Sequence, residues 1–285
     1  MHSKFVVVGC GYVGQRLLQR DLLATSILGV SRHRPDGSCP WLCIDLDTDV
    51  LDALIEPMDG AVVFYFAPPS SSSLRDDRSR RLLAAMEAQA CRPKAVVLIS
   101  TTGVYGDCAG SWVDENTPLQ AVASRSIRRV DAELVWGEFA ASAECPLAVL
   151  RVAGIYGPGK LPLARLSKSQ PLLLQSQSPY SNRVHVDDLL DSAVAAVGLN
   201  TVINVADGAP STMTAYFHEL ADAVGVARLP EADRESLAVQ WSQGLRSYMS
   251  ESRRVDNARM KKLLGGGLRY PNLAAGLAAS VAKRT

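Results

Sequence analysis

The chain has 285 residues, of which 47% are hydrophobic, and a formal net charge of +1. This length allows one large domain or a domain with a smaller lobe, and the small net charge gives no reason to expect a nucleic-acid partner. The six cysteines form no Cys-x-x-Cys pair, which argues against a metal site, and no apolar run approaches the roughly 18 to 20 residues that span a bilayer. Since the apolar start Phe5–Val8 also lacks a signal-peptide pattern, we expect a cytoplasmic protein without a membrane partner.

Short runs typical of buried strands alternate with longer amphipathic runs through the first half of the chain. The expected strands are Phe5–Val8, Ile27–Val30, Trp41–Ile44, Ala61–Phe66, Ala95–Ile99 and Leu147–Leu150. The expected helices between them are Tyr12–Arg20, Ser73–Cys91 and Gln120–Ala141. This order predicts an α/β fold of the Rossmann type, a doubly wound parallel sheet with helices on both faces.

After Arg151 the composition changes to loops rich in glycine and proline. We expect a smaller, C-terminal substrate lobe formed by residues 151–182 and 207–285. Residues 1–150 would form the dinucleotide-binding domain, to which residues 183–206 return. Further helices are expected at Val186–Leu199, Thr212–Val226 and Ser252–Leu264, and a further strand at Val202–Val205.

A glycine-rich turn directly follows the first expected strand. Residues 9–14 give the pattern GxGxxG, with Gly9, Gly11 and Gly14 at the three glycine positions and Tyr12 and Val13 between them. In such turns the glycines permit a tight bend, a close approach of the backbone to a pyrophosphate, and close packing of helix on strand. The pattern predicts a dinucleotide site, and the alternative is a structural turn without a ligand.

The end of the second strand indicates which dinucleotide would bind. An acidic residue there holds the ribose 2′-hydroxyl of NAD, but this chain has Ser31 and Arg32. Because a guanidinium can hold a 2′-phosphate with two hydrogen bonds, we predict NADP, with NAD as the other possibility. Asp45 and Leu46 at the end of the third strand would contact the adenine. The alternatives are that Arg32 is a solvated loop charge and that Asp45 is a helix cap.

Several further motifs follow in a fixed order along the chain: residues 66–69, 100–106, 114–118, 150–159 and 183–189. With them the chain resembles, over nearly its whole length, the extended short-chain dehydrogenase/reductase family of NAD(P)-dependent sugar-nucleotide epimerases and dehydratases. One departure is the GxGxxG spacing, where the family usually has GxxGxxG. The resemblance implies that Ala67 and Pro68 contact the cofactor, and that the protein forms a homodimer through the helices after the fourth and fifth strands.

The resemblance also indicates the catalytic positions. In the family a Ser or Thr follows the fifth strand and a Tyr-x-x-x-Lys pair lies on the next helix. Thr101 matches the first position, whereas Arg125 and Arg129 stand at the Tyr and Lys positions. The resemblance implies that Thr101 bonds a substrate oxygen and that Arg129 holds the nicotinamide ribose. Arginine stays protonated, however, and cannot replace the tyrosine as a proton donor.

Three other side chains are candidates for the missing proton donor: Tyr105, Tyr156 and His185. His185 suits the task because an unperturbed histidine has a pKa of about 6.5. In the resembling proteins, however, these positions build loops and the wall of the substrate site. Ser124, beside Arg125, has a hydroxyl but no evident base.

The arginines suggest an anionic substrate, because guanidinium groups bind phosphates and carboxylates with two hydrogen bonds. The alternative is a charged solvent face on which Arg125, Arg128 and Arg129 pair with Asp131 and Glu133. The residues expected to contact substrate are Thr102, Tyr105, Tyr156, Arg165 and Arg183, to which Arg246 could add.

Two functions remain open. The first is an epimerase/dehydratase-like oxidoreductase that uses NAD(P) and acts on a small polar substrate, either anionic or a sugar nucleotide. The second is an NADP(H)-binding sensor or partner protein without catalysis, because the tyrosine is missing from its expected position.

Overall fold

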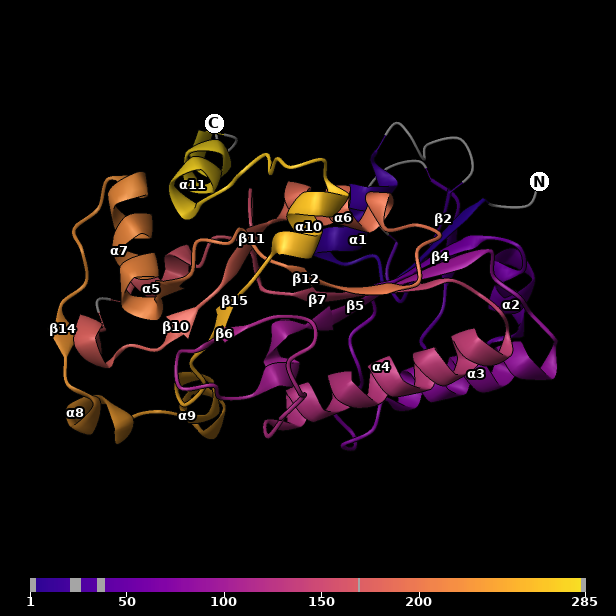
Figure 1. Cartoon of the computed structure of the whole chain (residues 1–285), viewed down its shortest axis with the longest axis horizontal. Coiled ribbons are helices and arrows are strands. Elements are labelled where there is room, and N and C mark those ends of the chain that lie inside the picture. Colours follow the sequence, from indigo (N-terminus) through magenta and orange to yellow (C-terminus); the bar gives the residue numbers. More distant parts are fainter. Residues whose placement is uncertain (1–3, 21–26, 35–38, 169, 283–285) are drawn as a thin grey trace. The chain divides into compact units, whose positions relative to one another are not determined.

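The computed structural model describes residues 4–20, 27–34, 39–168 and 170–282 (Figure 1). The chain divides into two compact units, each assembled from separate segments. The first unit comprises Met1–Val104, Ser124–Arg151 and Leu190–Ile203. The second unit comprises Tyr105–Ala123, Val152–Leu189 and Asn204–Thr285. None of the described helices is both long and apolar enough to cross a membrane.

A seven-stranded sheet with the order β12-β7-β5-β4-β1-β2-β3 forms the centre of the first unit. Its strands are β1 (Phe5–Val8), β2 (Ile27–Ser31), β3 (Trp41–Cys43), β4 (Val62–Tyr65), β5 (Ala95–Thr101), β7 (Leu147–Val152) and β12 (Thr201–Val205). The pairs that join β3, β2, β1, β4 and β5 are parallel, which confirms the predicted Rossmann-type sheet. The chain winds outward in both directions from β1, so the loops after β1 and β4 border the crevice where such sheets bind ligands.

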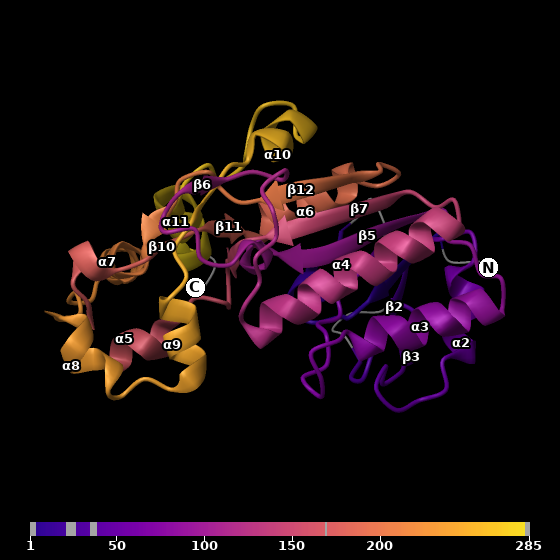
Figure 2. The ribbon, with the colours of Figure 1, turned by 60° about the horizontal axis from the view of Figure 1, so that its bottom comes forward.

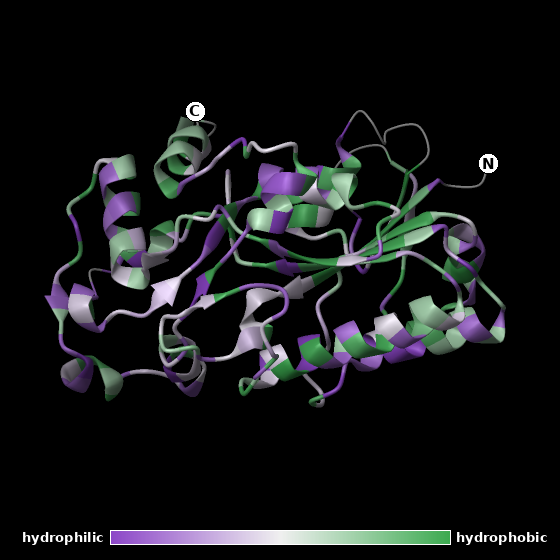
Figure 3. Ribbon diagram, viewed as in Figure 1, coloured by the Kyte–Doolittle hydropathy of each residue, from purple (hydrophilic) through white to green (hydrophobic). Residues whose placement is uncertain are grey.

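Helices cover both faces of this sheet. Within the first unit they are α1 (Tyr12–Leu18), α2 (Asp52–Met58), α3 (Asp77–Ala88) and α4 (Ser124–Ser142). Helices α3 and α4 lie side by side on one face, and α1 lies on the other (Figures 1 and 2). The central strands are predominantly hydrophobic (Figure 3), as expected for strands buried on both faces. The predicted homodimer would need exposed apolar side chains on α3 and α4. Leu134 on α4 is 57% exposed, but nothing in the structure tests the dimer, which stays a prediction.

The core under α3 and α4 is built around Trp136, which is fully buried. Its ring lies 4.9 Å from that of Tyr65 and 6.1 Å from that of Phe139. Its indole N–H donates to the Ser79 hydroxyl over 2.8 Å, so the polar atom of this large side chain is satisfied inside the core. This packing fixes the position of α4, which carries Arg125 and Arg129.

The second unit is made of short paired strands and short helices. The strand pairs are β6 (Trp112–Val113) with β15 (Arg254–Val255), β8 (Gly154–Tyr156) with β11 (Arg183–His185), β9 (Leu172–Leu173) with β14 (Glu231–Ala232), and β10 (Tyr180–Ser181) with β13 (Ser211–Thr212). Its helices are α5 (Leu163–Ser167), α7 (Met213–Val224), α8 (Arg234–Ala238), α9 (Gln243–Met249), α10 (Ala258–Leu263) and α11 (Leu273–Ala282), and α6 (Val186–Ala195) continues into the first unit. Helices α7 and α11 enclose a small core with Tyr156.

Some expected helices are shorter in the structure. Helix α3 begins at Asp77 rather than Ser73, because the Asp76 carboxylate accepts hydrogen bonds from the Ser79 amide and hydroxyl and caps the helix. The prediction of a helix over residues 252–264 was wrong for the first half of that range. There Arg254 and Val255 pair with β6, and only Ala258–Leu263 is helical.

Candidate cofactor and substrate sites

The glycine turn after β1 has the geometry that only glycine permits. Gly9 has a φ of +100°, and a Cβ there would lie 2.5 Å from the amide nitrogen of Ala67. A Cβ at Gly14 would lie 2.4 Å from the Gly9 carbonyl oxygen. A Cβ at Gly11, by contrast, would meet no described atom within 4 Å. Gly9 and Gly14 are therefore required by packing, whereas Gly11 faces open space that a ligand can approach.

A cavity of about 360 Å³ lies in the first unit beside this turn. It brings together these predicted cofactor residues: Gly9, Gly11, Ser31, Arg32, Asp45, Leu46, Ala67 and Pro68. They come from the loops after β1, β2, β3 and β4, so segments far apart in the sequence converge at the carboxyl ends of the strands. Other predicted cofactor residues do not line this cavity: Tyr12, Val13, Gly14, Thr101 and Arg129.

The wall of this cavity after β2 is cationic. Arg32, His33 and Arg34 follow β2 and are exposed, and Asp45 is the one acidic side chain among the described lining residues. The Ser31 hydroxyl donates to the His33 carbonyl over 2.6 Å, which shapes the turn. An oxygen of Asp45 accepts the Asp47 amide at 2.9 Å, so Asp45 also caps its own turn.

Arg78, which was not predicted from the sequence, also lines this cavity. Its Nε donates to Asp47 over 2.7 Å and its Nη1 donates to the Pro68 carbonyl over 2.7 Å. Hydrogen bonding to Asp47 raises the pKa of Arg78 above its usual value. No local motif marks this residue, because its place depends on contacts with two loops distant in the sequence.

Thr101 is the last residue of β5, and Arg125 and Arg129 lie in the first turns of α4, where Arg125 is exposed. The Thr101 hydroxyl accepts the Gly103 amide at 3.2 Å. Arg129 donates from Nη1 to the Ile99 carbonyl over 2.8 Å, and burial lowers its pKa. The two arginines are therefore in different environments, and the arginine at the tyrosine position is the more accessible one.

Asp131 and Glu133 on α4 do not form the ion pairs with arginines of the same helix that the solvent-face alternative expected. Asp131 forms an ion pair with Arg80, and Glu133 forms one with Arg151 at 2.8 Å. The Glu133 and Arg151 side chains are 10% and 8% exposed, and Ser100 also donates to Glu133. This buried network ties α4 to the carboxyl ends of β5 and β7.

The three candidate proton donors are buried within the second unit. Tyr105 is fully buried and donates to Oδ1 of Asn204 over 2.7 Å. Tyr156 is 1% exposed, and burial raises its pKa well above the usual value. His185 is fully buried, with its ring 3.9 Å from that of Tyr270. This burial favours their interpretation as packing residues. Thr102, expected to contact substrate, is also buried.

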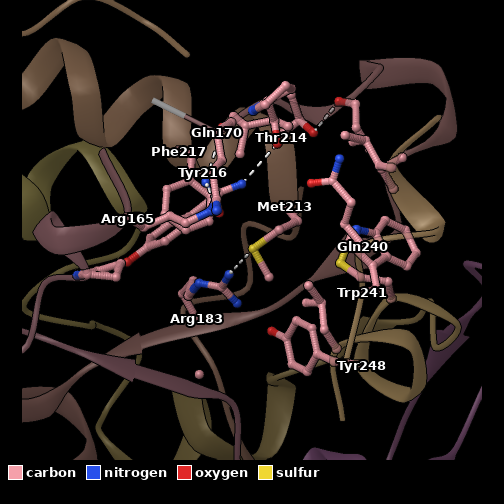
Figure 4. A pocket seen from close by; sticks show the side chains of 18 of the residues that line it. Arg165, Gln170, Arg183, Met213, Thr214, Tyr216, Phe217, Gln240, Trp241 and Tyr248 are labelled. Carbon is pink, nitrogen blue, oxygen red and sulfur yellow. Dashed lines mark hydrogen bonds between the residues drawn. The ribbon is translucent and has the colours of Figure 1, made fainter. Parts of the chain in front are cut away.

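Arg165 and Arg183, two of the residues expected to contact substrate, line a second cavity (Figure 4). Its volume is about 670 Å³, and it lies wholly within the second unit. Tyr105, Tyr156 and Arg246 are not among its lining residues. The predicted site residues thus line two of the cavities that the described residues form, one beside the glycine turn in the first unit and one around two arginines in the second.

The family model described as "NAD dependent epimerase/dehydratase family" matches residues 5–206. The chain belongs to this family. The match includes the glycine turn and every strand of the central sheet, and it confirms the resemblance drawn from the motifs. No curated protein matches the sequence.

Solved structures of similar fold extend the match along the chain. A functionally unknown conserved protein from Silicibacter pomeroyi is 31% identical, with 98% of each chain covered and a TM-score of 0.82. The UDP-glucuronic acid 4-epimerase from Bacillus cereus in complex with NAD is 18% identical, with 98% of each chain covered and a TM-score of 0.73. The UDP-glucose 4-epimerase from Thermotoga maritima with UDP-glucose is 18% identical, with a TM-score of 0.75. The alignment covers 98% of the chain described here and 97% of the epimerase chain.

Proposed function

We propose that the protein is an NADP(H)-binding oxidoreductase of this family that acts on a small anionic substrate. The observation that carries the proposal is the cationic wall after β2, where Arg32 and Arg34 border the cavity that contains the glycine turn. An acid in this place would accept the ribose 2′-hydroxyl of NAD and repel a 2′-phosphate, whereas a guanidinium attracts the phosphate.

The remaining residues of the cavity fit the rest of a dinucleotide. Gly11 leaves room for the pyrophosphate to approach the backbone, and Leu46, Ala67 and Pro68 supply apolar surface for a ring. The nicotinamide would supply the hydride chemistry when bound. Thr101 would hydrogen-bond a substrate oxygen, and the buried charge of Arg129 would stabilise negative charge that develops nearby.

A second function, NADP(H) binding without catalysis, is supported by the environment of the candidate proton donors. Arg125 at the tyrosine position cannot give up its proton, and Tyr105, Tyr156 and His185 are buried. Turnover would then require a proton from the Thr101 hydroxyl or from water.

Calorimetric titration with NADPH and NADH tests the cofactor proposal. In Arg32→Ala we expect the NADPH dissociation constant to rise about 10- to 100-fold, because a hydrogen-bonded charge pair is lost, while the NADH constant changes little. Arg92→Ala is the matched control, since Arg92 is exposed and lies just before the amino end of β5, whereas the cavity lies at the carboxyl ends of the strands. Equal losses for both nucleotides would contradict the 2′-phosphate contact.

Turnover separates the two functions. NADPH oxidation with a ketone, aldehyde or sugar nucleotide, lost in Thr101→Ala while NADPH still binds, would support the oxidoreductase. Tight NADPH binding with no hydride transfer to any compound of such a panel would support the non-catalytic function.

A further inference from the structure

The cavity of the second unit has an unusual combination of walls. Most of the wall is apolar or aromatic. It comes from β9, α7, α8, α9 and the loop between α8 and α9, and includes Leu172, Leu173, Met213, Tyr216, Phe217, Leu237, Trp241, Leu245, Tyr248 and Met249. In Figure 4 the labelled rings of Tyr216, Trp241 and Tyr248 lie on different sides of this space. About 670 Å³ is the size of a site for a small organic ligand.

The charged side chains of this cavity all have the same sign. Lys160, Arg165 and Arg183 line it, and none of the described lining residues is an aspartate or a glutamate. A cavity with cations and no acids attracts anions, and its apolar walls strengthen that attraction because they exclude water.

Arg183 is the central cation. It is 8% exposed, and its guanidinium lies 4.2 Å from the ring centre of Tyr216. It donates to the Asn182 carbonyl over 2.9 Å and contacts the Met213 sulfur at 3.3 Å. Among the residues that the structure describes, no carboxylate lies within 4 Å of it. A buried guanidinium held by a carbonyl, a thioether and a ring is costly without a counter-ion, which a bound anion would supply.

Asp207, a buried acid that interacts electrostatically with Arg183, is a poor counter-ion for it. Asp207 is 3% exposed, its Oδ2 has no hydrogen-bond partner among the described residues, and burial raises its pKa to about 7. This shift weakens Asp207 as a counter-ion for Arg183. The positive charge of Arg183 remains available to a ligand in the cavity.

The other polar groups of the cavity are few, and several are already engaged; the Gln240 amide and the Tyr248 hydroxyl also line it. The Thr214 hydroxyl donates to the Leu173 carbonyl over 2.7 Å, and Arg165 donates to carbonyls of Gln170 and Pro171. Sugar hydroxyls buried against leucine, methionine and aromatic rings would lose water without gaining partners, and binding would weaken with each of them. An aromatic or branched apolar body would instead gain from the same walls.

We propose that this cavity binds an organic anion with an aromatic or branched apolar body, with the anionic group on Arg183, and that such compounds rather than sugar nucleotides are the substrate class. The assignment as substrate rests on the function proposed above, whereas the binding itself does not. The ligand chemistry is an amphipathic carboxylate, sulfonate or phosphate monoester.

Fluorescence titration with 8-anilinonaphthalene-1-sulfonate, an aromatic anion, tests the site in protein saturated with NADPH. Its uncharged analogue N-phenyl-1-naphthylamine measures the apolar contribution alone. We expect one sulfonate probe to bind per chain, and Arg183→Gln to weaken it about 10-fold or more while the uncharged analogue binds as before. Arg259→Gln, at a 43% exposed position of the same unit outside the cavity, is the matched control and should change neither.

A second variant keeps the test valid if Arg183→Gln does not fold. Leu245 lines the cavity from α9 and is 42% exposed, so Leu245→Glu can be accommodated while it places a negative charge at the apolar wall. We expect it to weaken both probes, and the anionic one more strongly.

Competition decides between the substrate classes. Displacement of the probe by 1-naphthoate at lower concentrations than by UDP-glucose would support the proposal. Tighter binding of UDP-glucose, or unchanged probe binding in both variants, would overturn it. Calorimetry with NADPH alone reports on the cofactor site, so a failure of that proposal is distinguished from a failure of this one.

Discussion

Replacing Asp207 by asparagine should make the protein more stable at alkaline pH. The Asp207 side chain is 3% exposed, one oxygen accepts the Ala209 amide at 3.0 Å, and the other has no partner among the described residues. Burial raises the pKa of the carboxyl from 3.8 to about 7. Because the folded-state pKa lies above the unfolded one, the folded state binds more protons between these values, and stability falls as the pH rises through this window.

The magnitude follows from the shift. About 3 pKa units correspond to about 4 kcal/mol over the whole window, and about 3 kcal/mol of this is lost between pH 5 and pH 8.5. The substituted asparagine would carry no such charge, but its amide would leave a buried donor unpaired at a cost of about 1 to 3 kcal/mol. We therefore expect Asp207→Asn to be more stable than the wild type at pH 8.5, and this advantage to disappear or reverse at pH 5.

Urea denaturation of both proteins at pH 5 and pH 8.5 measures this difference. Asp222→Asn is the control, because Asp222 is on the surface and its hydrogen bonds to Arg228 lower its pKa. Both pH values lie above the ordinary pKa of this carboxyl, so the effect of its variant on stability should be nearly the same at pH 5 and at pH 8.5. An Asp207→Asn protein with the same pH dependence of stability as the wild type would refute the reasoning.

Three further substitutions test the structure at other places. Gly9→Ala should lower the melting temperature and abolish NADPH binding in calorimetry, because its Cβ would meet the Ala67 backbone at 2.5 Å; unchanged binding would show that the turn is not the cofactor site. Glu133→Gln should cost about 3 to 5 kcal/mol in urea denaturation, because Arg151 would remain buried without its partner; a loss below about 1 kcal/mol would contradict the buried pair. Tyr105→Phe should cost about 1 to 3 kcal/mol, because it leaves Oδ1 of Asn204 without the 2.7 Å hydrogen bond, and it should leave any turnover intact.

The parts of the cavity beside the glycine turn that lie in local motifs could be predicted from the sequence. Gly9 and Gly11 lie in one short turn, and Arg32 directly follows a strand whose place in the sheet is set by its apolar run. Arg78 could not be predicted, because its guanidinium is positioned by Asp47 and Pro68, which lie on other loops. Motif spacing locates a strand end, but it does not show which distant side chain bends back to it.

Burial was equally hard to predict within the second unit. Tyr156 and His185 belong to family motifs, and both were candidates for a proton donor because of their chemistry. Whether such a ring faces a ligand or a core depends on the helices that cover it, and α11 begins more than a hundred positions beyond Tyr156 along the chain. Very short elements such as β15 could not be predicted from the sequence either, because a two-residue strand has no hydrophobic periodicity to detect.

The contact of Tyr156 with Gly276 has a consequence for synthesis on the ribosome. A Cβ at Gly276 would lie 1.9 Å from the Tyr156 hydroxyl oxygen, so α11 closes directly over this ring. The small core that holds Tyr156 also contains Leu273 and Leu277, which are translated long after it. During elongation this ring and its apolar neighbours stay uncovered, while the strands of the central sheet are all available once β12 has emerged. The second unit therefore completes its core last, and chaperones and proteases can reach that unfinished core until α11 has emerged.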